Sequence, residues 1–340
     1  MTNNAPAIMI CGHGSRDKGA VDEFNRLAGR LKAQFPGTDI ESGFLEFATP
    51  VIRDGLEKLK AHGAKKIVCV PAMLFAAGHV KNDLPSEVNT YAHDNPELDL
   101  IYAADLGIDA RLLQAARARI EAALEAADGR KEVSREDTLL MVVGRGTNDP
   151  DANSNVAKVT RMLWEGIGFG WAETSYSGVA FPLVDAGLDH AARLGYKRIV
   201  VFPYFLFTGI LVRRIYDWTD AAQERFPGID FIKAGYLNDH SLLIETFADR
   251  VRQALEGDNA MNCQLCKYRE QIIGREADQG APQVGHHHHV QGIGTEDDAR
   301  DHGLAHVHGH SHSHGHSHVH AHGHDHERTA VPADRRDEEG

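Results

Sequence analysis

Two apolar segments govern how this chain of 340 residues folds: Lys66-Ile-Val-Cys-Val-Pro-Ala-Met-Leu-Phe75 and Lys197-Arg-Ile-Val-Val-Phe-Pro-Tyr-Phe-Leu-Phe207. Each is short and almost wholly apolar, which is typical of a strand buried on both faces of a parallel sheet. The same pattern occurs in Ala7-Ile-Met-Ile-Cys-Gly-His13 and Thr138-Leu-Leu-Met-Val-Val-Gly144. Matching residues recur 132 positions apart: Gly12 and Gly144, Pro50 and Pro182, Leu56 and Leu188, Gly63 and Gly195, Ile67 and Ile199, Pro71 and Pro203, Phe75 and Phe207. We therefore predict an internal duplication.

Helical patterns separate the strands of each copy. In the first copy the apolar spacing predicts helices at residues 21–35, 50–62, 83–93 and 109–127, and further strands at 40–48 and 98–102. Strands that alternate with helices favour an α/β fold with parallel sheets. We expect two duplicated, flavodoxin-like domains, at residues 1–128 and 138–256, joined by a charged linker near 128–137.

Beyond residue 256 the hydrophobic periodicity stops. Such a segment cannot bury enough apolar area to offset the entropy of ordering, so we expect residues 257–340 to form a disordered tail. The tail is rich in histidine: the chain has 22, of which 16 lie between His286 and His326.

Composition excludes several classes of protein. A net charge of -13 and a pI of about 5.9 argue against a nucleic-acid partner, which would need a basic face. No apolar run is long enough to span a membrane, and the first residues do not resemble a signal peptide. Four cysteines do not make a disulfide framework in a chain of this length, so we expect a cytoplasmic protein.

The duplication supplies an internal comparison for chemistry. Residues that serve the fold should match in both copies, whereas catalytic residues can survive in one. Three polar residues of the first copy are replaced in the second by residues of different chemistry. His13 is matched by Arg145, Glu46 by Gly178, and His79 by Leu211. All three follow strands, and ligands of open α/β sheets bind at the carboxyl ends of the strands. We therefore predict that His13, Glu46 and His79 converge on one metal-binding and proton-accepting site.

These residues stand in motifs that resemble a known family. Gly12-His-Gly-Ser-Arg16, Phe44-Leu-Glu-Phe-Ala48 and Pro71-Ala-Met-Leu-Phe-Ala-Ala-Gly-His79 are similar to the class II tetrapyrrole chelatases, and in particular to the long-form sirohydrochlorin cobaltochelatases of the CbiX type. The resemblance implies two similar domains facing a cleft. It also implies a lyase that inserts a divalent metal into sirohydrochlorin without ATP.

The resemblance assigns metal binding and proton acceptance to His13 and His79, assisted by Glu46. The resemblance implies cobalt insertion in cobalamin biosynthesis, and imidazole suits Co²⁺. Because imidazole must be neutral to bind metal, insertion should weaken below about pH 6. The substrate carries many carboxylates, so we expect it to be bound by Ser15, Arg16, Lys81, Arg145, Arg213 and Arg214. The apolar residues Met73, Leu74, Phe75, Phe205 and Phe207 either line the macrocycle site or belong to the core, and the core is favoured.

The tail carries two further metal-binding motifs. Cys263 and Cys266 have C-x-x-C spacing, and the resemblance links them to an iron–sulfur cluster, written as [4Fe-4S]. Two cysteines are half of the usual four ligands, so a shared cluster would require other ligands or a homodimer. We also expect the histidines to bind divalent metal: His286, His287, His288, His289, His306, His308, His310, His312, His314, His316, His318, His320, His322, His324 and His326.

Three alternatives stay open at this point. An iron-inserting sirohydrochlorin ferrochelatase for sirohaem would use the same site residues. A non-enzymatic metal-storage protein or metallochaperone would use the tail but would not need His13, Glu46 and His79. A histidine phosphatase usually has arginine before its nucleophilic histidine, where this chain has Gly12.

Overall fold

The computed structural model describes residues 6–261 and 265–282. The first repeat consists of β1 (Ala7–Gly12), α1 (Lys18–Gln34), β2 (Ile40–Phe44), α2 (Ile52–Ala61), β3 (Lys66–Pro71), η1 (His79–Asp83, a π-helix), α3 (Leu84–Asp94), β4 (Asp99–Tyr102) and α4 (Ala110–Asp128). The second consists of β5 (Thr138–Gly144), α5 (Pro150–Ile167), β6 (Trp171–Tyr176), α6 (Val184–Ala192), β7 (Arg198–Pro203), α7 (Ile210–Arg225), β8 (Asp230–Lys233) and α8 (Ser241–Glu256).

The two repeats form equivalent parallel sheets. The strand order is β2-β1-β3-β4 in one sheet and β6-β5-β7-β8 in the other, and every neighbouring pair is parallel. Residues 132 positions apart occupy equivalent places, as where β3 begins at Lys66 and β7 at Arg198. The α/β fold with duplicated parallel sheets is confirmed.

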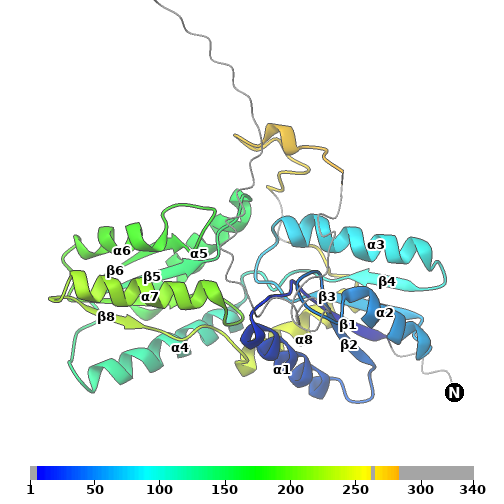
Figure 1. Cartoon of the computed structure of the whole chain (residues 1–340), viewed down its shortest axis with the longest axis horizontal. Helices are drawn as coiled ribbons and strands as arrows, with labels where there is room; N and C mark the ends of the chain where they lie inside the picture. The colour runs from blue at the N-terminus through cyan, green and yellow to red at the C-terminus, as the bar shows by residue number, and fades with distance from the viewer. Residues whose placement is uncertain (1–5, 262–264, 283–340) are drawn as a thin grey trace, which may run out of the picture. The chain divides into compact units, whose positions relative to one another are not determined.

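The last helix of each repeat packs on the other repeat. Helix α4 contacts α5, β7 and β8, whereas α8 contacts α1, β3 and β4, and the two helices also contact each other (Figure 1). One hydrophobic cluster therefore runs through both repeats and includes the buried faces of α1, α4, α5 and α8. Burial of this shared apolar surface stabilises both sheets together and fixes the positions of their loops relative to each other.

The opposite face of each sheet has a core of its own. Met9, Leu56 and Tyr91 belong to the core under α2 and α3, and Met141, Leu188 and Ile215 to the equivalent core under α6 and α7. With both faces covered, the central strands β1, β3, β5 and β7 are almost wholly apolar and buried, as the sequence predicts.

The described part of the tail differs from the predicted disorder. Residues 265–282 contain the short helix η2 (Glu276–Asp278), and Cys266 and Lys267 are buried. The Lys267 ammonium lies 3.1 Å from the Asp278 carboxylate, which gives this short segment a polar anchor. The histidines from His286 to His326 lie outside the described residues. Within those residues, no helix has the length and apolar character needed to cross a membrane.

Candidate active site

Three loops at the carboxyl ends of β1, β2 and β3 bring His13, Glu46 and His79 together. A ligand atom from each of the three lies within 4.8 Å of the others. The His13 Nε2 atom is 3.0 Å from the His79 Nε2 atom and 3.4 Å from Glu46 Oε1. The convergence follows from the parallel sheet, because neighbouring strands end at the same edge.

The loop after β1 is closed against the loop after β2. The Glu46 amide donates a hydrogen bond to the His13 carbonyl oxygen at 3.0 Å. Gly14 has φ +99°, and a Cβ atom there would lie 1.6 Å from the Glu46 carbonyl oxygen. Glycine is therefore required next to His13, because no other residue allows the two loops to approach so closely. Phe47 packs near the His13 ring, with 5.9 Å between ring centroids.

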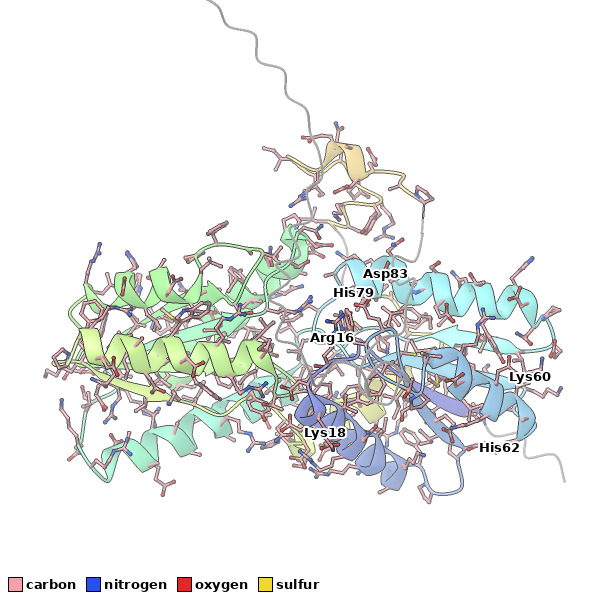
Figure 2. The ribbon with its side chains drawn as sticks, in the orientation of Figure 1. Arg16, Lys18, Lys60, His62, His79 and Asp83 are labelled. Carbon is pink, nitrogen blue, oxygen red and sulfur yellow. The ribbon has the colours of Figure 1, made fainter. Side chains whose placement is uncertain are left out.

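His79 begins the π-helix η1, and its ring is oriented by a carboxylate four residues later. The His79 Nδ1 atom lies 2.7 Å from Asp83 Oδ2, and the Asn82 side chain donates to the other oxygen of Asp83. A carboxylate on Nδ1 fixes the tautomer that leaves Nε2 with its lone pair, as in many metal sites. In Figure 2, His79 and Asp83 lie near Arg16, while Lys60 and His62 lie at the other end of the repeat.

The same tautomer is fixed on the other histidine. His13 Nδ1 lies 2.9 Å from the Gly14 carbonyl oxygen, an acceptor, so Nδ1 carries the proton. The two Nε2 atoms then face each other at 3.0 Å, each with a lone pair when its ring carries a single proton on Nδ1. Lone pairs at that distance repel unless a proton or a cation lies between them. The arrangement can therefore hold a proton or a metal cation between the two rings.

The distances suit a transition-metal ion. Metal–nitrogen bonds of about 2.0–2.1 Å can close on two nitrogens 3.0 Å apart at an angle of roughly 90°. Glu46 supplies a carboxylate oxygen on the same side. Two imidazoles and one carboxylate leave further positions open, as exchange of the ion requires.

The surroundings keep His13 neutral. Burial lowers the pKa of His13 to about 3, and the charges of His79 and Arg145 add to this effect. The His13 imidazole is therefore unprotonated at pH 6, so the expected weakening of insertion below about pH 6 would have to come from another group. Arg145 belongs to the second repeat, so this repeat contributes electrostatically to the site.

The structure places the predicted substrate-binding residues in three different surroundings. Arg16 is exposed above the Phe47 ring at 5.4 Å, Arg145 is exposed beside the site, and the Ser15 hydroxyl accepts from the Asp17 amide. Lys81 differs, because its ammonium is buried and lies 2.8 Å from Asp149 and 3.2 Å from Asp151. It therefore does not face the solvent.

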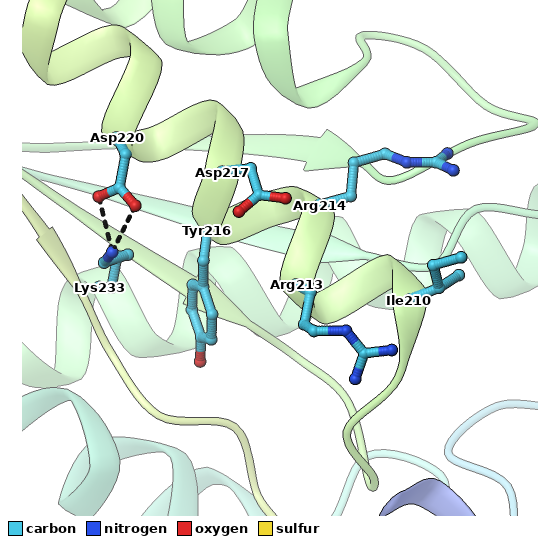
Figure 3. A pocket seen from close by; sticks show the side chains of 7 residues that line it. All are labelled: Ile210, Arg213, Arg214, Tyr216, Asp217, Asp220 and Lys233. Atoms are coloured by element: carbon cyan, nitrogen blue, oxygen red, sulfur yellow. Dashed lines mark hydrogen bonds and ion pairs between the residues drawn. The ribbon is translucent and has the colours of Figure 1, made fainter. Parts of the chain in front are cut away.

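Arg213 and Arg214 lie on α7, away from the three metal-ligand candidates. Arg213 pairs with Asp17 of the first repeat, and Arg214 lies over the Trp218 ring. Both line an open hollow of about 400 Å³, shown in Figure 3 with Ile210, Tyr216, Asp217, Asp220 and Lys233.

The apolar residues considered for the macrocycle site belong mainly to the cores. These partly buried side chains pack against the three clusters: Met73, Leu74, Phe75, Phe205 and Phe207. Exposed apolar side chains occur instead on loops of the second repeat, where Val179 is 72% and Phe181 is 79% exposed. These two residues match Phe47 and Thr49 of the first repeat in the 132-residue register.

Sequence reasoning missed Asp83, Asp149 and Asp151. A signal for Asp83 was present, because an i, i+4 spacing places it beside His79 on a helical turn. Burial opposes the charge of Lys81, but the Asp149 and Asp151 carboxylates outweigh it and raise the pKa of Lys81. Cys263 lies outside the described residues.

Comparison with known proteins agrees with this geometry. The CbiX family matches residues 7–123 and 139–254. A sirohydrochlorin cobaltochelatase of Priestia megaterium is 35% identical over 268 residues, which cover 78% of this chain and 86% of that protein. A sirohydrochlorin ferrochelatase of the same organism is 31% identical, over 73% of this chain and 90% of that protein. The structure of SirB from Bacillus subtilis with Fe³⁺ has a TM-score of 0.65 at 27% identity, covering 75% of this chain and 98% of that one.

Proposed function

Because the chain belongs to the CbiX family of sirohydrochlorin chelatases and is a metal-inserting lyase, we propose that it inserts Co²⁺ into sirohydrochlorin, without ATP, in cobalamin biosynthesis. The observation that carries the proposal is the pair of Nε2 atoms 3.0 Å apart, with Glu46 beside them. These three side chains hold the ion before it enters the ring. Cobalt is favoured by the similarity to a cobaltochelatase that is 35% identical over 268 residues.

Insertion exchanges one metal ion for two pyrrole protons, so the site must also accept protons. As the ion passes to the ring nitrogens, the Nε2 lone pairs of His13 and His79 are freed and become bases. His79 is placed to accept a proton, because the Asp83 carboxylate 2.7 Å from Nδ1 holds the ring with Nε2 toward the site. His13 keeps a proton poorly, since burial lowers its pKa to about 3. Glu46, next to His13, relays protons toward solvent.

The substrate is anchored by its carboxylates and by its flat apolar faces. Arg16 and Arg145 are exposed beside the site, and a guanidinium can bind a carboxylate through two hydrogen bonds. Val179 and Phe181 offer exposed apolar surface on the loop that corresponds to the Glu46 loop. Charged groups thus bind the rim of the macrocycle and apolar groups its face.

A metal-insertion assay tests the proposal. Sirohydrochlorin is mixed with the protein and either Co²⁺ or Fe²⁺, and the visible spectrum is followed as the metal enters. We expect faster insertion of Co²⁺ than of Fe²⁺ in matched anaerobic reactions. Absence of protein-dependent insertion of either ion would refute the proposal.

Iron insertion for sirohaem is the second candidate. A ferrochelatase from Priestia megaterium is 31% identical, and a similar structure contains Fe³⁺. A higher kcat/KM for Fe²⁺ than for Co²⁺ would favour it. A storage protein or metallochaperone would bind metal without inserting it, and the assay separates that alternative as well.

The tail adds two proposals, which rest on the histidines and Cys263, outside the described residues, and on the buried Cys266. Histidines 286–326 bind divalent metal and deliver it when it is scarce. Removing them should lower the rate in chelator-buffered Co²⁺ but not at ample Co²⁺; equal rates would refute delivery. Cys263 and Cys266 bind a [4Fe-4S] cluster shared by a homodimer, which iron and sulfide analysis with measurement of the molecular mass can test.

A further inference from the structure

Two ion pairs join the repeats, and they are equivalent in the 132-residue register. Lys81 of the first repeat pairs with Asp149 of the second, and Arg213 of the second pairs with Asp17 of the first. In each pair the cation follows the third strand of its repeat. The aspartate is the N-cap of the first helix of the other repeat, α5 or α1.

The two pairs differ sharply in burial. The Lys81 and Asp149 side chains are 2% and 0% exposed, and Asp151 adds a second carboxylate 3.2 Å from the ammonium. The Arg213 side chain is 55% exposed. A surface pair contributes little to stability, whereas removing one partner of a buried pair leaves a charge without compensation. The Lys81 pair therefore fixes the position of its loop far more strictly than the Arg213 pair.

The backbone around the two cations also differs. Lys81 lies in the π-helix η1, two residues after His79 and two before Asp83. Arg213 lies in the regular α-helix α7, where Leu211 takes the place of His79. Among the described residues, a π-helix is assigned only at η1. π-Helical turns are rare and are frequent at functional sites.

The link to the metal site is short. The Lys81 amide donates to the Ala77 carbonyl oxygen at 2.8 Å, so the Lys81 backbone is tied to the turn that carries His79. The same turn carries Asp83, which orients the His79 ring. A shift of the turn would therefore move His79 Nε2 away from His13, which is held by a different loop.

We propose that Asp149 and Asp151 are positioning residues, supplied by the second repeat, which hold η1 through Lys81 and thereby set the 3.0 Å separation between His79 and His13. The inference rests on the proposed function, and it gives the second repeat a role in metal binding although that repeat lacks the three ligands. The positioning acts on the metal and leaves recognition of sirohydrochlorin to other groups.

The variant Asp149→Asn tests this in the full chain. Asparagine is an equally good N-cap, so the variant removes the charge and keeps the cap of α5. The matched control is Asp230→Asn, which removes one of two carboxylates from another buried cation, Arg198. We expect Asp149→Asn to raise the KM for Co²⁺ about tenfold or more, while the KM for sirohydrochlorin changes less than twofold. Asp230→Asn should change neither.

Two results would overturn the proposal. One is an unchanged KM for Co²⁺ in Asp149→Asn; the other is an equal rise of both KM values, or the same rise in Asp230→Asn, which indicates general loosening. If Asp149→Asn does not fold, Asp151→Asn tests the same point, with a smaller rise in the KM for Co²⁺ expected.

Failure of the proposed function is distinguishable from failure of this inference. If the unaltered protein inserts no metal, the binding of Co²⁺ is titrated instead. The variant His13→Ala then gives the background from Co²⁺ bound at all other sites of the chain. Weaker Co²⁺ binding in Asp149→Asn then supports positioning, and unchanged binding refutes it.

Discussion

The loops after β1 and β2 and the equivalent loops after β5 and β6 follow nearly the same path. Phe47 and Val179 have φ of 64° and 65°, and Gly14 and Gly146 both have positive φ. In the first repeat these loops carry His13 and Glu46, and in the second they carry Arg145 and Gly178. The backbone that carries the candidate metal ligands thus persists in the second repeat, where those ligands are absent. The shared framework is a matter of folding, and the activity depends on a few side chains.

The largest effect is expected at His79. Because His79→Ala removes both a proposed metal ligand and a proposed proton acceptor, we expect at least a 100-fold loss of insertion rate. Leu211→Ala, at the equivalent position of the second repeat, should retain nearly full rate. The insertion rates of the two variants are measured with Co²⁺, after circular dichroism has verified that both variants are folded. Similar rates in the two variants would contradict the assignment of the site to the first repeat.

A second pair of variants separates folding from chemistry. Gly14→Ala and Gly146→Ala each put a Cβ within 2 Å of a carbonyl oxygen, at 1.6 Å and 1.8 Å respectively. Both should lower the free energy of unfolding by more than about 1 kcal/mol, because positive φ and the close approach disfavour any side chain. Only Gly14→Ala should reduce insertion by tenfold or more at a temperature where both variants are folded, since it displaces His13 and Glu46. Equal losses of rate would show that the two loops matter alike.

The pH dependence of stability should distinguish His13 from Arg145. The pKa of His13 is lowered by burial to about 3, from an ordinary value of 6.5. Between these values the unfolded chain binds a proton that the folded, metal-free protein does not, so stability falls as pH falls from 6.5 toward 3. We expect His13→Gln to remove about 2 kcal/mol of the stability difference between pH 7 and pH 5, as measured by denaturant unfolding. Identical pH profiles would be inconsistent with a neutral, buried imidazole.

The smallest effect is expected at Arg145, the counterpart of His13. Arg145→Gln removes a cation near the site, which should raise the KM for sirohydrochlorin less than tenfold and leave the KM for Co²⁺ nearly unchanged. Steady-state kinetics with each substrate varied in turn checks this. A large change in the KM for Co²⁺ would show that Arg145 acts on metal binding and not on the binding of sirohydrochlorin.

Much of the fold was predictable from local signals. Apolar strands and the 132-residue register predict the parallel sheets, and the same register singles out His13, Glu46 and His79. The exchange of α4 and α8 between repeats was not predictable, because an amphipathic helix has the same pattern whichever sheet it covers.

The buried ion pair of Lys81 and Asp149 was also not predictable from the sequence. Its members are 68 residues apart, and a lysine in a polar loop looks like a surface residue until the second repeat covers it. Only the tertiary structure reveals that its ammonium is desolvated and paired.

Anomalous scattering from Co²⁺-soaked crystals tests the central claim most directly. The account predicts a cobalt peak within bonding distance of the Nε2 atoms of His13 and His79 and of a Glu46 oxygen. It also predicts no peak at Arg145, Gly178 and Leu211. Cobalt bound elsewhere in the repeats, with no peak between the two histidines, would contradict it.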